Sequence, residues 1–124
     1  MTIQEMLETH PKAAEKVQAW FLNKMIESMK DQSVPDEFKE MMRQQGIDNE
    51  RIAKIVEANP RSLFDVFDEN QLYIKIDIFV KEDGSAKFGW SVNAEQSSSS
   101  LRASRTEAEK EAVAKAFEML NKKL

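Results

Sequence analysis

The sequence predicts an α+β protein with an N-terminal segment of four or five helices, an antiparallel β-hairpin and a packed C-terminal helix. Apolar residues recur with helical spacing through residues 1–70, and a period of two replaces this spacing over residues 71–80 and 87–92. The segment 104–124 then begins with a capping signal and keeps its apolar residues on one face. At 124 residues the chain has the size of one domain, with a helical segment over residues 1–70 and a hairpin-plus-helix segment over residues 71–124.

Start signals divide residues 1–70 into helices. Thr2 and Glu5 form a T-x-x-E capping box ahead of a short first helix. Pro11, Pro35 and Pro60 each stand where a helix can begin, because proline at the first helical position loses no hydrogen bond.

The second helix, 11–30, has the widest apolar face and is therefore predicted to be central. The third, from about 35 to 45, ends at Gly46, and Asp48 caps the fourth. A short fifth helix or turn follows Asn59. Residues expected to face the core are Phe21 and Met25 in the second helix, Phe38, Met41 and Met42 in the third, and Ile52, Ile55 and Val56 in the fourth.

The hairpin is predicted from a change to period two. Residues 72–80 alternate apolar and mostly polar side chains, Asp83 and Gly84 form a turn signal, and a return strand carries Phe88, Trp90 and Val92. The stretch AEQSSSS reads as a polar loop, and residues 101–103 are compatible with a brief third strand. Ser104 and Glu107 form a second capping box, which starts the last helix.

Composition limits the classes of function. The chain has no cysteine, a net charge of −4, and no apolar run of membrane-spanning length. We therefore expect a cytoplasmic protein that does not enter a membrane, and the negative charge argues against general attraction to nucleic acid.

No catalytic, cofactor or metal site is predicted. His10, the only histidine, precedes Pro11 and so belongs to a helix boundary. Three glycines supply no phosphate-binding loop. Asp65, Asp68 and Glu69 lack the donor spacing of a calcium loop, and the serines at 97–100 are expected to form a plain loop, although they could hold a ligand.

Four side chains on one face of the first strand form the candidate interface: Tyr73, Lys75, Asp77 and Phe79. They lie opposite the isoleucines, so either another layer of the chain covers them or they contact a partner. Because two strands alone are marginal, we also expect a homodimer through strand edges.

The C-terminal segment resembles two families. Ser104, Arg105 and Ala108 match the start of the final helix in double-stranded-RNA-binding domains, whereas Thr106 and Glu109 stand where that family has lysines. Gly89, Trp90 and Val92, followed by the alanine-rich helix, resemble the tail of small phage proteins with an α-β-α sandwich. Together the two resemblances cover about residues 86–120.

The favoured hypothesis is a non-enzymatic, protein-binding accessory module, phage-encoded as the second resemblance implies, that occupies the surface of an unknown protein partner. The alternative is weak nucleic-acid binding by the basic side of the hairpin and last helix. Its candidate contacts are Lys75, Lys81, Lys87, Arg102 and Arg105.

Overall fold

The helices of the N-terminal segment begin at the signals that the sequence supplies. The computed structural model describes residues 2–29, 35–94, 96–97 and 100–124. Helix α1 (Ile3–Thr9) is capped by Thr2, whose hydroxyl accepts a hydrogen bond from the Glu5 N–H at 3.1 Å. Helix α2 (Pro11–Ser28) starts at its proline, and its predicted end at Lys30 lies outside the described residues.

Helices α3 and α4 also have the predicted boundaries. Helix α3 (Asp36–Gln45) ends at Gly46, whose φ of 70° is the conformation that favours glycine. Helix α4 (Asn49–Ala58) is capped by Asp48, which accepts from the Arg51 N–H at 2.8 Å.

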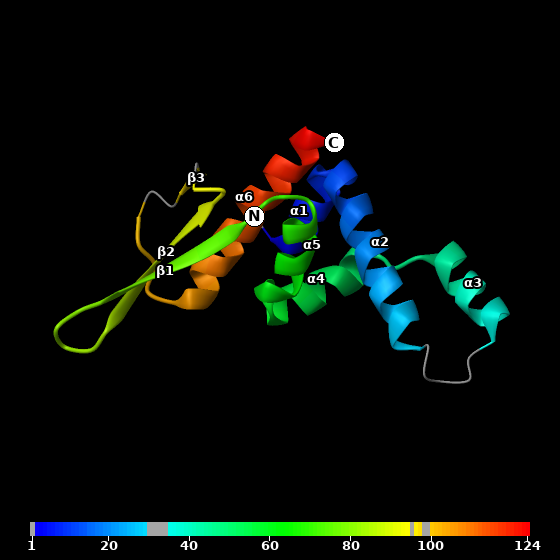
Figure 1. Ribbon diagram of the computed structural model, residues 1–124, viewed down its shortest axis with the longest axis horizontal. Helices are drawn as coiled ribbons and strands as arrows, with labels where there is room; N and C mark the ends of the chain where they lie inside the picture. Colours follow the sequence, from blue (N-terminus) through cyan, green and yellow to red (C-terminus); the bar gives the residue numbers. More distant parts are fainter. Residues whose placement is uncertain (1, 30–34, 95, 98–99) are drawn as a thin grey trace.

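Three core predictions for these helices are wrong. Phe38 and Met41 on α3 and Ile55 on α4 are exposed, whereas Ile52 and Val56 are buried. Helix α3 buries none of its residues and lies at one end of the molecule, beside α2 (Figure 1). Within the described residues, Phe38 and Met41 of its apolar stripe are therefore exposed and Met42 is half-buried.

A short 3-10 helix, η1 (Pro60–Leu63), leads into α5 (Phe64–Glu69). Helix α5 ends in a Schellman motif: the N–H of Leu72 donates to the Phe67 carbonyl at 2.8 Å, and the N–H of Gln71 donates to the Asp68 carbonyl at 3.0 Å. Leu72 is buried in this motif, so the first strand begins at Ile74 and not at Leu72.

The sheet is antiparallel and has the order β1-β2-β3. Strands β1 (Ile74–Val80) and β2 (Ala86–Val92) form the hairpin, in a register that sets Ile76 opposite Trp90. Strand β3 (Gln96–Ser97) lies inside the segment predicted as a loop, and Arg102 forms only an isolated bridge to Phe88. Asn93 and Ala94, with φ values of 55° and 60°, make the turn between β2 and β3.

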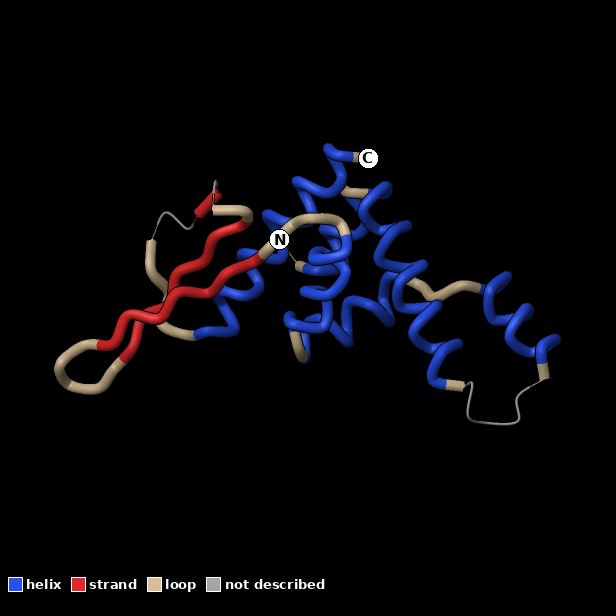
Figure 2. Tube along the Cα trace, in the orientation of Figure 1, coloured by secondary structure: helices blue, strands red, loops and turns tan. Residues whose placement is uncertain are grey.

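Helix α6 (Arg105–Lys123) joins the hairpin to the N-terminal helices. It packs on the hairpin with one side and on α1, α2, η1 and α5 with another, while the hairpin extends away from the helices (Figures 1 and 2). The fold class is thus α+β, as predicted. The most deeply buried large side chains are Phe67, Phe117, Ile3, Leu7, Ile52, Leu63 and Leu120.

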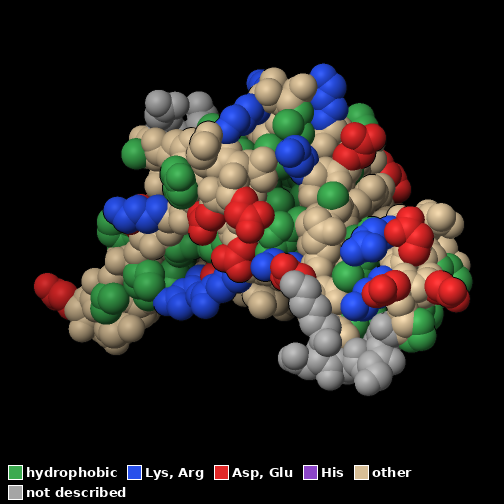
Figure 3. Space-filling model, turned by 45° about the vertical axis from the view of Figure 1, so that its right-hand side comes forward, with side chains coloured by type: hydrophobic (Ala, Val, Ile, Leu, Met, Phe, Trp, Pro, Cys, Tyr) green, Lys and Arg blue, Asp and Glu red, His purple; other side chains and the backbone are tan. Residues whose placement is uncertain are grey.

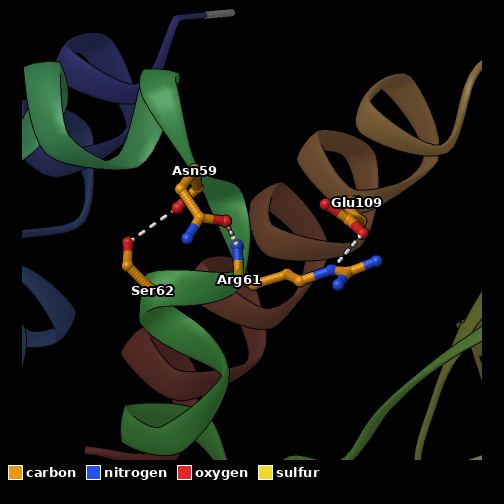
Figure 4. A network of polar contacts seen from close by, with 4 residues as sticks. All are labelled: Asn59, Arg61, Ser62 and Glu109. Carbon is orange, nitrogen blue, oxygen red and sulfur yellow. Dashed lines mark hydrogen bonds and ion pairs between the residues drawn. The ribbon is translucent and has the colours of Figure 1, made fainter.

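One ion pair fixes η1 against α6. The Arg61 Nε lies 2.7 Å from an oxygen of Glu109, whose residue is only 4% exposed (Figure 4). Asn59 holds the start of η1, because its side chain accepts from the Arg61 N–H at 3.2 Å and its carbonyl accepts from the Ser62 hydroxyl at 2.8 Å. The arginine is therefore presented to the carboxylate by a capped turn.

Candidate interaction surface

The hairpin has one face toward α6 and one face toward solvent. Alternation places Ile74, Ile76, Ile78 and Val80 of β1 on the same side as Ala86, Phe88, Trp90 and Val92 of β2. Val92 at the base is buried, while Val80 at the tip is 70% exposed. The Arg105 guanidinium, at the start of α6, lies 5.6 Å from the centre of the Phe88 ring. Cover by α6 thus decreases toward the tip of the hairpin.

The outer face carries the predicted interface. Tyr73 is 56% and Phe79 is 52% exposed, so within the described residues no layer of the chain covers these two rings. Between them the Lys75 ammonium lies 3.3 Å from the Asp77 carboxylate. Two exposed aromatic rings therefore flank an ion pair whose lysine is exposed and whose aspartate is partly buried. Figure 3 shows hydrophobic and charged side chains together on the surface of the hairpin.

The tip of the hairpin is held by a hydrogen-bonded turn. Asp83 accepts from the N–H and the hydroxyl of Ser85 at 2.9 and 2.6 Å, and these bonds lower the pKa of Asp83. The φ of Gly84, at 88°, is a conformation that favours glycine. Lys81 closes the turn, because its N–H donates to the Ser85 carbonyl at 2.7 Å.

Glu111 of α6 fixes the base of the hairpin. Its oxygens accept from Arg102 Nε at 2.8 Å, and one of them accepts from the Trp90 indole N–H at 3.2 Å. The hydrogen bond from Arg102 is the main reason that the pKa of Glu111 is lowered, and the bond from Trp90 acts in the same direction. One carboxylate thus ties α6 to β2 and to the segment that bridges β2.

This arrangement predicts a pH dependence. A carboxyl group with a lowered pKa stabilises the fold above its unfolded value of about 4.5, and this contribution is lost as the pH falls through the folded value. We expect Glu111→Gln to lower the free energy of unfolding at neutral pH, and the difference from the unchanged chain to shrink well below pH 4.5. Urea unfolding of both proteins at neutral pH and well below pH 4.5 measures these free energies of unfolding. A difference between the two proteins that is equal at both pH values would contradict the role of the carboxylate.

The five basic residues of the alternative hypothesis do not share one face. Lys75 and Lys87 belong to the outer face, Lys81 to the turn, and Arg105 to the side that holds Phe88. Arg102 is bonded to Glu111. Glu109, which stands where the RNA-binding family has a lysine, is buried against Arg61 and does not face solvent.

The other sequence candidates carry no assembled chemistry. His10 lies at the junction of α1 and α2, as predicted, and its Nδ1 is 2.9 Å from the Met6 carbonyl oxygen. A hollow of about 460 Å³ beside it is lined by Met6, His10, Trp90, Glu111, Ala114, Lys115 and Glu118. In the described ranges no group of three or more histidine or acidic side chains is placed to bind a metal. Ser98 and Ser99, of the loop considered for a ligand, lie outside those ranges.

Sequence reasoning missed the exposure of the apolar side chains at the tip. Ile78 and Val80 continue the alternation of Ile74 and Ile76, and this pattern does not show that both are exposed, as is Leu101. The position of Val80 directly before the charged turn Lys81-Glu82-Asp83 is the signal that could have indicated an uncovered tip.

No helix in the described residues combines the length and the apolar character needed to cross a bilayer. Comparisons of the chain with protein-family models, with curated proteins and with solved structures found no match. A proposal of function is therefore argued from the geometry of the hairpin.

Proposed function

We propose that this protein is a non-enzymatic binding module whose outer hairpin face, Tyr73, Lys75, Asp77 and Phe79, docks on a partner protein. The observation that carries the proposal is the exposure of two aromatic rings on the open face of a sheet. Aromatic side chains supply much of the binding energy in protein interfaces, because they bury a large area and lose little conformational freedom.

The ion pair between the rings supports the same interpretation. Lys75 and Asp77 carry opposite charges 3.3 Å apart, so a partner that covers them need not leave either charge unpaired. The resemblance of the tail to small phage proteins is the ground for proposing a phage accessory protein, which acts by occupying the surface of its partner.

Phe79 offers a direct test of this surface. A photo-crosslinking amino acid at position 79 should capture the partner. The same amino acid at position 38 is the control and should not, because Phe38 is comparably exposed but lies on α3, outside the proposed surface. With the partner purified, Phe79→Ala should raise the dissociation constant about 30-fold, because it removes a large side chain from the interface. Phe38→Ala should leave the dissociation constant unchanged. Calorimetric titration measures both.

Two results would contradict the proposal. One is a partner that crosslinks equally from both positions or binds both alanine variants alike. The other is binding of duplex RNA that weakens steeply with salt and disappears in Arg105→Glu, since such binding would establish the nucleic-acid alternative.

A further inference from the structure

The free edge of β1 has a defined set of unpaired backbone groups. Strand β1 is the outermost strand of the sheet. Its odd-numbered residues bond toward β2, since the Tyr73 carbonyl accepts from the Asn93 N–H at 2.9 Å and the Lys81 N–H donates to the Ser85 carbonyl at 2.7 Å. On β2, Phe88 bonds away from β1, to Arg102.

Hydrogen bonding in an antiparallel strand alternates from one edge to the other. The N–H and C=O groups of the even-numbered residues Ile74, Ile76 and Ile78 therefore point to the free edge. Among the described strands β1 has a neighbour on one side only, so this edge is not paired within the described chain. Strand β1 contains no proline, so each of its residues has an N–H group that can donate to a neighbouring strand.

We propose that a second copy of the chain pairs with this edge, antiparallel and in the register centred on Ile76. The two 3-stranded sheets then become one continuous six-stranded sheet. The two-fold axis sets Ile76 opposite Ile76 of the second copy and Ile74 opposite its Ile78. These are the residues whose backbone groups are free, so the hydrogen-bonding pattern of the edge is satisfied.

Charge favours this register over the two neighbouring registers that keep the same backbone pattern. On the outer face it places Lys75 opposite Asp77 of the second copy, twice, once on each side of the axis. A register centred on Lys75 would set lysine opposite lysine, and one centred on Asp77 would set aspartate opposite aspartate. Like charges directly opposite each other destabilise a strand pair, whereas opposite charges stabilise it.

The aromatic rings match in the same register. Tyr73 falls opposite Phe79 of the second copy, and aromatic pairs across strands are favourable. Both the charged and the aromatic pairs occupy positions without backbone hydrogen bonds between the two copies, where opposed side chains come closest. A register centred between two residues would set odd against even residues and is excluded by the backbone pattern.

The dimer goes beyond the protein-binding function and does not depend on it. The second copy pairs sideways at the edge, while the outer face of the joined sheet stays open and carries both sets of aromatic rings. A partner could dock there whether or not the chain dimerises. Tests of the dimer use the purified chain alone, so their failure is distinct from a failure to capture a partner.

The first experiment exchanges charges. The chain should have a light-scattering mass about twice its 14.3 kDa. Lys75→Glu and Asp77→Lys should each be monomeric, because every cross-strand charge pair becomes repulsive. An equal mixture of the two should regain the dimer mass, since the introduced glutamate then faces the introduced lysine, and the remaining Asp77 faces the remaining Lys75. Low salt is used because screening weakens such pairs.

Lys87→Glu is the matched control, because Lys87 lies on the outer face but on β2, away from the edge. It should leave the dimer mass unchanged. A mass near 14.3 kDa for the unchanged chain at every concentration would overturn the proposal, and so would dimers of both single variants or a mixture that stays monomeric.

A second experiment does not rely on charge. The chain has no cysteine, so Tyr73→Cys with Phe79→Cys introduces the only thiols. In the proposed register these positions face each other at about 4.5 Å between Cα atoms, within disulfide reach. Oxidation of the double variant should give a covalent dimer on a non-reducing gel, and Phe79→Cys alone should give at least about tenfold less. Equal yields from the two would overturn the register.

Discussion

Phe117→Ala is expected to lower the free energy of unfolding by about 3–5 kcal/mol, the range for removing a large buried aromatic side chain. Phe117 lies on α6, has no exposed surface, and packs edge to face on Phe67 of α5 with 5.5 Å between ring centres. Its loss leaves a cavity between the helix that carries the hairpin and the N-terminal helices. Urea unfolding measures the change.

Phe38→Ala on α3 is the control, since the same atoms are removed from a side chain that is 44% exposed. It should cost under about 1 kcal/mol, as surface substitutions do. Comparable losses from both variants would show that Phe117 does not pack as the structure indicates.

Phe117→Ala also tests the prediction that residues 1–124 form one domain. Trp20 lies in the helical segment and Trp90 in the hairpin, so single-tryptophan versions report on each of them separately. If α6 makes them one cooperative unit, Phe117→Ala should shift both fluorescence transitions equally. Separate midpoints would indicate two units.

Helix starts could be predicted from the sequence because their causes are local. Thr2, Asp48 and Ser104 each accept a hydrogen bond from an N–H three residues ahead, and this geometry needs only the capping residue and a free backbone donor. The turn at Gly84 is local in the same sense, since glycine adopts its positive φ without strain.

The start of β1 could not be predicted because its cause is not visible in residue type. Gln71 has a φ of 63°, a conformation usually taken by glycine or asparagine at the end of a helix. Held there, it lets Leu72 close α5 and enter the core, although Leu72 continues the alternation of the strand. A period-two pattern reports which side chains share a face, and the backbone bonds decide where pairing begins.

The candidate surface was only partly predictable for a similar reason. Alternation placed Tyr73 and Phe79 on the face opposite the isoleucines, and the structure shows both side chains exposed. Alternation also places Ile78 and Val80 on the side of Ile74 and Ile76, yet both are exposed because α6 does not cover the far end of the hairpin. Which portion of an apolar face is covered depends on how two elements overlap, and neither sequence pattern contains that overlap.

Removing the arginine of the buried ion pair should also be strongly destabilising. We expect Arg61→Ala to lower the free energy of unfolding by about 2–3 kcal/mol, because Glu109 would remain buried without its partner. The value lies below the usual loss of about 3–5 kcal/mol for breaking a buried pair, because the Arg61 side chain is half-exposed and water can reach the carboxylate in its absence. The N–H of residue 61 still donates to Asn59, so the capped start of η1 is kept in the variant.

The second substitution Glu109→Gln separates the buried charge from the loss of packing. If the unpaired carboxylate is the cause, Arg61→Ala with Glu109→Gln should be more stable than Arg61→Ala alone, because a buried amide costs less than a buried charge. Urea unfolding of the two single variants and the double variant completes the cycle and gives the coupling energy of the pair. A double variant that is less stable than Arg61→Ala would show that the unpaired charge of Glu109 is not the source of the destabilisation.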